Sequence, residues 1–423
     1  SLAGATESAQ VNGSGWIDWV KDENACQTNY TYDAMGRLAS INYPVNDTVA
    51  WSPTTLVFEP VGATEYGIPA SHWRQTIITG NARKITYFDG MWRPLVTREY
   101  DTANVAGTQR FRRVAYDAGG RVSFTSYPGT TDALTTGVWS FYDSLGRPTS
   151  VTQDSELGPL TSSTQYISGF QTVSTNPRGQ STTNGYQVYD QPTYDLLRWS
   201  VQPEGKVIEV FRNTYLGVPE QLRQRNAVGG LQQSRYYVYA GYRQLCKASE
   251  PETGATVMDY DGAGNLMRPA VGPPDVPSTA ICNKDEGYWW GRRVHRSYDA
   301  RNRLSALAFP DGRGNQSWGY TPDGLPASIN TYNEPGNAGH VVNAYTYNKR
   351  RMMVGESVAQ PGWYSWGIGY GYDANASLSA QTYPTGLSVG YAPNALGQAT
   401  QAGSYATGVQ YYPNGAIKQF MYG

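Results

Sequence analysis

The stretch Tyr298-Asp299-Ala-Arg-Asn302-Arg303-Leu304, which continues to Phe309-Pro310-Asp311-Gly312, decides the fold of this 423-residue chain. An aspartate at the first position of a type I turn can hold the backbone of its own turn. We expect the tyrosine to end one strand and the Arg-Leu pair to begin the next. Proline cannot donate a hydrogen bond to a neighbouring strand, so Pro310 marks that strand's end. The stretch therefore predicts one β-hairpin.

The same pattern recurs along the chain. Copies that begin at Tyr32, Tyr116 and Tyr372 superimpose on it without gaps, and in each the second aromatic residue follows the first tyrosine by eleven positions. Copies that begin at Tyr142 and Tyr260 keep the first half. The residues that we assign to the repeated motif are Tyr32, Asp33, Gly36, Arg37, Tyr116, Asp117, Gly120, Arg121, Tyr142, Asp143, Gly146, Arg147, Tyr260, Asp261, Gly264, Tyr298, Asp299, Arg303, Tyr372 and Asp373.

Weaker copies fill some of the gaps between these segments. Phe88-Asp89 has Trp92 in place of the glycine, Tyr194-Asp195 lacks the glycine, and Tyr347-Asn348 keeps only the tyrosine. A single hairpin is only marginally stable in water, so successive hairpins must pair edge to edge. Apolar residues fall on both sides of the strand after Arg303, which predicts a sheet with neither face fully dry. The fold class that follows is all-β, with tandem hairpins in one continuous, spiralling sheet.

The composition agrees with many short strands. The chain has 34 Tyr, 12 Trp and 47 Gly, and it contains no apolar stretch with the period of a helix. Its formal net charge of −1 excludes the basic surface that a nucleic-acid partner needs. No apolar run is long enough to span a membrane. Of the three cysteines, Cys246 and Cys282 flank one divergent segment and either form a disulfide or remain two thiols.

Tyr-Asp-x-x-Gly-Arg-Leu followed by Tyr-Pro, repeated with decay, resembles the YD-repeat or Rhs-repeat family, from about Tyr30 to Tyr422. Members include bacterial Rhs toxins, the shell-forming C component of Tc toxins and the teneurin YD shell. The resemblance implies a secreted or extracellular hollow shell, or part of one, that encloses a C-terminal toxic domain. Partners implied are that domain, neighbouring shell segments, components of a delivery system, and a surface glycan or receptor.

One departure from the family concerns its shell-terminating segment, which carries Asp-Pro motifs and a self-cleaving aspartate site. This chain contains no Asp-Pro pair. We therefore expect a segment of a longer shell, without cargo and without the protease. We expect residues 1–29 to lead into the shell and residues 30–423 to form it, with a divergent, proline-rich excursion at about 268–284.

Catalytic motifs in the sequence are incomplete. The three histidines, His72, His295 and His340, lack metal-ligand spacing. Gly386-Leu-Ser388-Val-Gly390 has the spacing of a nucleophile elbow, but Pro393 argues against the helix that must follow. Asp259-Tyr-Asp261 superficially resembles a calcium loop whose last ligand would be Ala270. We predict no enzyme activity, no cofactor and no metal.

Two other classes of function remain as alternatives. The first is an extracellular adhesion module that binds carbohydrate or a receptor through exposed aromatic residues, of which Trp289-Trp290, Trp363 and Trp366 form the densest groups. The second is a glycan-active enzyme on a β-scaffold, although no readable motif pairs two carboxylates. A wide lumen would favour the shell. An exposed aromatic patch would favour the binding module, and clustered carboxylates in a cleft would favour the enzyme.

Overall fold

The computed structural model describes residues 6–190, 193–271, 281–282 and 293–423, and these residues are almost entirely β. They form 33 strands, the short helix α1 (Val105–Thr108) and two single-turn 3-10 helices, η1 (Gly241–Arg243) and η2 (Pro335–Asn337). In this described part, no helix has the length and apolar character needed to cross a membrane. The prediction of an all-β chain of tandem hairpins is confirmed, because each strand with an assigned pairing is antiparallel.

The chain divides into two compact units. The first unit combines Ser1–Trp139, Gly319–Ile329 and Val342–Gly423, and the second combines Ser140–Trp318 and Asn330–Val341. This division does not bear on the predicted boundary between residues 29 and 30, which stays a prediction. Most of the predicted excursion, at residues 272–280 and 283–284, lies outside the described residues.

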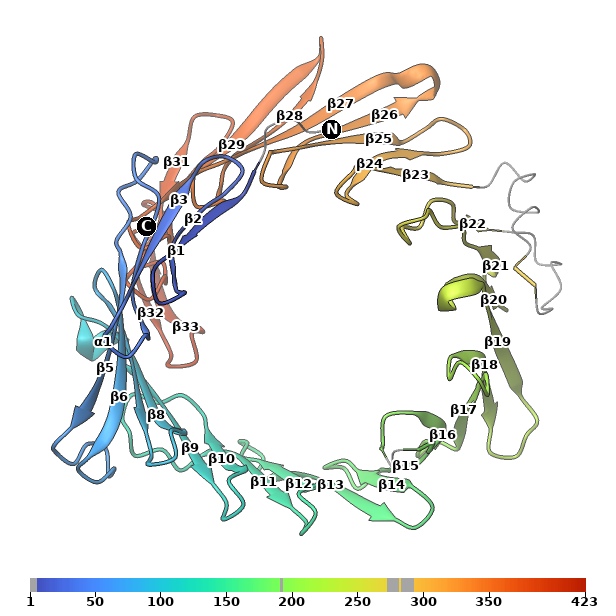
Figure 1. Ribbon diagram of the computed structural model, residues 1–423, viewed down its shortest axis with the longest axis horizontal. Coiled ribbons are helices and arrows are strands. Elements are labelled where there is room, and N and C mark those ends of the chain that lie inside the picture. The colour runs from blue at the N-terminus through green and yellow to red at the C-terminus, as the bar shows by residue number, and fades with distance from the viewer. Residues whose placement is uncertain (1–5, 191–192, 272–280, 283–292) are drawn as a thin grey trace. The chain divides into compact units, whose positions relative to one another are not determined.

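The N-terminal part of the first unit is a meander in which each strand pairs with the next (blue to teal in Figure 1). Its strands are β1 (Ser8–Val11), β2 (Ile17–Lys21), β3 (Gln27–Tyr32), β4 (Leu38–Asn42), β5 (Thr54–Val61), β6 (His72–Thr79), β7 (Ala82–Phe88), β8 (Pro94–Asp101), β9 (Arg110–Tyr116), β10 (Val122–Ser126) and β11 (Gly137–Tyr142).

The C-terminal part of the first unit repeats this arrangement, with pairing from β27 to β31 and a final hairpin. Its strands are β26 (Pro326–Glu334), β27 (Ala338–Tyr347), β28 (Met353–Gln360), β29 (Tyr364–Tyr372), β30 (Leu378–Thr382), β31 (Ser388–Gly390), β32 (Ala406–Tyr411) and β33 (Ile417–Tyr422). Strands β11, β25 (Asn315–Tyr320), β26 and β27 each contribute residues to both units.

The second unit is also a meander, paired in sequence order from β12 to β22 and from β23 to β25. Its strands are β12 (Pro148–Gln153), β13 (Leu160–Ile167), β14 (Gln171–Thr175), β15 (Ser181–Tyr186), β16 (Leu197–Val201), β17 (Lys206–Arg212), β18 (Pro219–Asn226), β19 (Gln232–Tyr239), β20 (Leu245–Glu250), β21 (Gly254–Val257), β22 (Ala270–Val271), β23 (His295–Tyr298), β24 (Leu304–Ala308) and β25 (Asn315–Tyr320).

In an antiparallel meander, successive turns alternate between the two ends of the strands. Each aspartate turn of the motif joins an odd-numbered strand to the next even-numbered one, as Asp33 joins β3 to β4 and Asp373 joins β29 to β30. All such turns within one meander therefore lie at the same end of its strands, which we call the aspartate edge.

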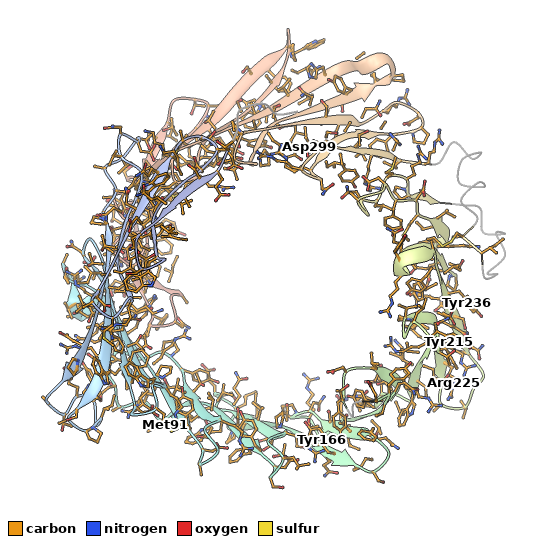
Figure 2. All side chains as sticks on the ribbon, in the orientation of Figure 1. Met91, Tyr166, Tyr215, Arg225, Tyr236 and Asp299 are labelled. Atoms are coloured by element: carbon orange, nitrogen blue, oxygen red, sulfur yellow. A yellow bond between two sulfur atoms is a disulfide. The ribbon has the colours of Figure 1, made fainter. Side chains whose placement is uncertain are left out.

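Among the described residues, buried apolar residues are few, and outside one small cluster they are scattered, as Val207 and Val257 are in the second unit. Ile68, Ile85, Tyr87, Val96 and Phe111 form a small cluster in the first unit. Along β24, every residue on both faces is half-buried. Side chains project from both faces of the sheets (Figure 2). The predicted sheet with neither face fully dry is thus present, and its strands need support beyond a hydrophobic core.

Candidate functional site

The aspartate of each motif holds its own turn. The Asp33 Oδ1 atom accepts hydrogen bonds from the backbone N–H groups of Met35 (2.9 Å) and Arg37 (3.0 Å), and Oδ2 accepts from Arg37 Nε (2.7 Å). The backbone N–H of Gly36 donates to the Asp33 carbonyl, and that of Asp33 donates to the Arg37 carbonyl. The strands shift register beside this turn, which makes it a type I turn closed by a bulge.

The fourth residue of the turn has a positive φ, which is why glycine is common there. Gly36 has φ of 79°, and the same conformation is adopted by Trp92 (64°), Asn302 (59°) and Ala376 (70°). Trp92 gains compensating contacts, because its ring stacks on Phe58 with centroids 5.2 Å apart. The turn geometry therefore survives loss of the glycine.

The arginine of the motif reaches the neighbouring hairpin. The Arg93 guanidinium lies 4.4 Å from the ring centroid of Tyr116, the tyrosine of the following motif, and the Arg147 guanidinium lies 4.1 Å from the ring of Tyr166. Figure 2 labels Tyr166 in the second unit. Each arginine is thus held by its aspartate on one side while it covers an aromatic face on the other.

A tyrosine hydroxyl links many of the hairpins to the hairpin before it. Tyr372 donates to the carbonyl oxygen of Met353 (2.7 Å), which lies five residues after Asn348, the first residue of the preceding turn on the aspartate edge. The same offset of five residues recurs in the bonds of Tyr32 to Ile17, Tyr116 to Pro94, Tyr166 to Pro148, Tyr260 to Leu245, Tyr298 to Leu266, Tyr347 to Pro326 and Tyr411 to Ala399. We call this bond the tyrosine tie.

The titration behaviour of these groups matches their roles. Backbone hydrogen bonds from Arg121 and Arg147 hold the pKa values of Asp117 and Asp143 below the ordinary value for aspartate. Burial raises the pKa of Tyr372, so its hydroxyl stays protonated and able to donate. Turn and tie are therefore both present at neutral pH.

Several positions have the turn geometry without the aspartate. Asn348 and Asn394 accept the same two backbone N–H groups through their amide oxygens. An amide oxygen accepts hydrogen bonds as a carboxylate does, so asparagine followed three residues later by glycine, as Asn394 is by Gly397, was a readable signal. Asn348 is followed by Arg351 instead, and its turn had no such signal. Tyr194-Asp195 differs from our prediction, because Leu197 already begins β16 and leaves no room for the turn.

A second type of contact joins distant parts of the first unit, where the orange-red and blue strands overlap in Figure 1. The Lys349 backbone N–H donates to Asp47 Oδ2 (3.0 Å), and the Arg350 guanidinium lies 3.6 Å from the Tyr43 ring centroid and 5.0 Å from that of Trp51. Turn 348–351 of the aspartate edge thus sits on the connection between β4 and β5, about 300 residues earlier in the chain.

Two more turns follow in the same order. The Ser52 backbone N–H donates to the Ala374 carbonyl (2.8 Å), and the Ala395 backbone N–H donates to Asp101 Oδ2 (2.8 Å). Asp101 is buried at the end of β8. The aspartate edge of residues 342–423 therefore contacts the opposite strand ends of residues 1–139. We call this contact the seam, and nothing in the sequence pattern pointed to it.

The second unit contains a disulfide between Cys246 and Cys282, whose Cα atoms are 5.3 Å apart. Cys246 lies in β20 and is fully buried. Cys26 in the first unit is a free thiol, and burial raises its pKa.

The incomplete catalytic motifs lie in ordinary structural positions. Ser388 begins the short strand β31, so the segment after it is not helical. Asp261 holds the backbone of its own turn, as Asp33 does. Among the described residues no group of histidine, cysteine and acidic side chains is arranged to hold a metal ion. Trp363 and Trp366 are exposed on the β28–β29 hairpin, whereas Trp289-Trp290 lies outside the described residues.

Comparisons with known proteins give distant structural likenesses. No family model matches the chain. No curated protein matches it. A crystal structure of TcdB2–TccC3 with Cdc42 is similar over 97% of this chain and 26% of that chain, at 13% identity and a TM-score of 0.41. A Photorhabdus luminescens Tc holotoxin pore with a substituted TccC3 is similar over 99% and 26%, at 12% identity and a TM-score of 0.37. The chain thus spans about a quarter of these proteins, and scores this low do not establish a shared function.

Replacing Tyr372 by phenylalanine tests the tyrosine tie, because it removes the hydroxyl and keeps the ring. We expect Tyr372→Phe to lower the free energy of unfolding by about 1 kcal/mol, as measured by denaturant titration. Tyr215→Phe is the matched control, since the Tyr215 side chain is 93% exposed. Equal effects of the two substitutions would show that the tie contributes nothing to stability.

Acidification should loosen the turns. Because the pKa values of Asp117 and Asp143 are lowered in the folded chain, ionised carboxylates favour folding, and this contribution disappears as the pH falls from about 5 to about 3. The double variant Asp117→Asn/Asp143→Asn keeps the acceptors without the charges. We expect the denaturation midpoint of this double variant to vary less with pH in this range than that of the wild type. The midpoint of Asn176→Asp should vary more than that of the wild type. Parallel pH profiles for all three proteins would contradict this.

Removal of the disulfide should destabilise the second unit. The bond closes a loop of 36 residues, and we expect Cys246→Ser/Cys282→Ser to lower the free energy of unfolding by about 3 kcal/mol. Cys26→Ser should have no comparable effect. Mass spectrometry of the alkylated, unreduced protein provides the direct check, and three modified cysteines would show that the bond is not formed.

Proposed function

We propose that this chain is a wall segment of an encapsulating shell of the Rhs or Tc type, and that the shell encloses a toxic polypeptide cargo. The observation that carries the proposal is the seam, where three successive turns of one meander contact the opposite strand ends of another. Contacts of this kind let a later part of a hairpin chain pack edge to edge on an earlier part, so that the chain forms a wall of successive layers of hairpins.

The energetics of the sheet support a wall over a filled domain. Both faces of strands such as β24 are only half-buried, and the fully buried apolar cluster has five members. A sheet of this type cannot rely on one dry core. It is stabilised by strand pairing, by tyrosine ties between hairpins and by Asp–Arg pairs in the turns, all of which repeat along the chain.

Exclusion is the mechanism that such a wall offers. A continuous sheet has no unpaired strand ladder between its hairpins, so a polypeptide on one side is kept from proteases and binding partners on the other. The proposed partners are a toxic domain of the same protein, adjoining shell segments and a delivery apparatus. The proposed location is extracellular. None of these roles requires catalysis by this chain.

The seam can be tested with Arg350→Ala combined with Asp101→Ala. We expect the backbone amides of Ser52 and Ala395 to exchange hydrogen faster in this variant, because their partners across the seam are loosened or lost. Arg112→Ala, which changes an exposed arginine on β9, is the control. Unchanged protection of both amides would show that the seam does not form in solution.

The encapsulating role itself is tested by limited proteolysis of the longest natural polypeptide that contains this chain. We expect its toxic segment to resist cleavage in the wild type and to be cleaved in the Arg350→Ala/Asp101→Ala variant. The same segment expressed alone should be cleaved as in the variant. A segment that is cleaved equally in all three preparations would overturn the proposal.

A further inference from the structure

A pocket of about 470 Å³ lies in the second unit and is lined by residues of β16, β17 and β18 and of the connections beside them. Trp199, Glu209 and Arg223 stand directly opposite one another on these three strands and form its floor. Tyr189, from the connection between β15 and β16, and Arg212, at the end of β17, also line it. The tyrosine ties and the seam do not use any of these side chains.

The charges around the pocket do not balance. Glu209 is paired with Arg223 (2.7 Å) and also with Arg225 (3.1 Å), and the hydrogen bond from Arg223 lowers its pKa. Arg212 donates to the Gly217 carbonyl (3.1 Å) and, like the exposed Arg198, has no acidic partner within the described residues. The pocket therefore contains one carboxylate against three lining arginines, which favours an anionic ligand.

Aromatic surface accompanies this positive charge. Trp199 lies across Gly185 on the neighbouring strand, where any Cβ atom would overlap the indole, so the glycine is needed for the ring to lie against the sheet. Phe211 and Tyr189 are 42% and 48% exposed. Flat aromatic faces beside hydrogen-bonding groups suit the C–H faces and hydroxyls of a sugar ring.

We propose that this pocket binds a carboxylated sugar, such as the uronic or sialic acid residue of a glycan. Arg212 and Arg198 would hold the carboxylate, and guanidinium groups fit a carboxylate through two parallel hydrogen bonds. Trp199 and Tyr189 would pack against the ring, while Glu209 would accept hydrogen bonds from sugar hydroxyls and the Gln187 amide N–H would donate to them. This binding site is independent of the proposed encapsulation, because it needs only the second unit's own sheet.

The test uses the full 423-residue chain with methyl β-glucuronide as the probe and methyl β-glucoside as its neutral counterpart. Calorimetry measures affinity, and saturation-transfer NMR identifies the ring protons in contact with the protein. We expect the glucuronide to bind, and Arg198→Gln/Arg212→Gln to weaken binding by at least about tenfold. Arg178→Gln, at an exposed turn of the same unit, should bind as the wild type does.

Circular dichroism and the denaturation midpoint establish that each variant is folded. Arg198→Gln alone, which changes an exposed side chain, gives the same readout if the double variant does not fold. Tyr189→Ala should weaken binding while leaving the midpoint unchanged. Equal binding of glucuronide and glucoside, an absence of binding, or inorganic phosphate that displaces the glucuronide with equal affinity would each overturn the proposal.

Discussion

The hydrogen bond from a tyrosine hydroxyl to a carbonyl oxygen in the preceding hairpin sets how successive hairpins stand beside one another. A tyrosine ring has a fixed length, so the bond forms only when the two hairpins have one relative register. For the hydroxyls of Tyr116, Tyr298 and Tyr372, the accepting carbonyl always belongs to the fifth residue after the first residue of the preceding turn. Strand pairing alone does not specify a register this strongly when both faces of a sheet are half-buried.

The turns complete this arrangement, because each turn fixes the position of the tyrosine that precedes it and of the strand that follows it. The Asp33 carboxylate binds two backbone N–H groups and the arginine four residues later, so that the strand leaving the turn starts at a defined residue. Asparagine at position 348 or 394 does the same through its amide. The turn geometry is thus kept at positions of this chain where the residues of the motif have changed. Hairpins with a degenerate motif can therefore still pair with their neighbours.

The sequence was sufficient to predict the hairpins, the aspartate turns and the mixed burial of the strands. Those features depend on residues within a dozen positions of one another. The acceptor of the tyrosine tie was not predictable, because it is a main-chain carbonyl that leaves no side-chain signature. The seam was not predictable either, since Asp101 and Ala395 are nearly 300 residues apart. At Tyr194-Asp195 the opposite holds, because the motif residues are present in the sequence but the turn is absent from the structure.

The position of the motif turns of each meander on one edge has a consequence for how such a chain can change in length. Loss or gain of one strand would reverse the direction of every strand downstream and move every later turn to the wrong end. Insertions and deletions that preserve the architecture must therefore comprise an even number of strands. Duplication of whole hairpins satisfies this rule automatically, which makes it the natural route by which such a chain lengthens.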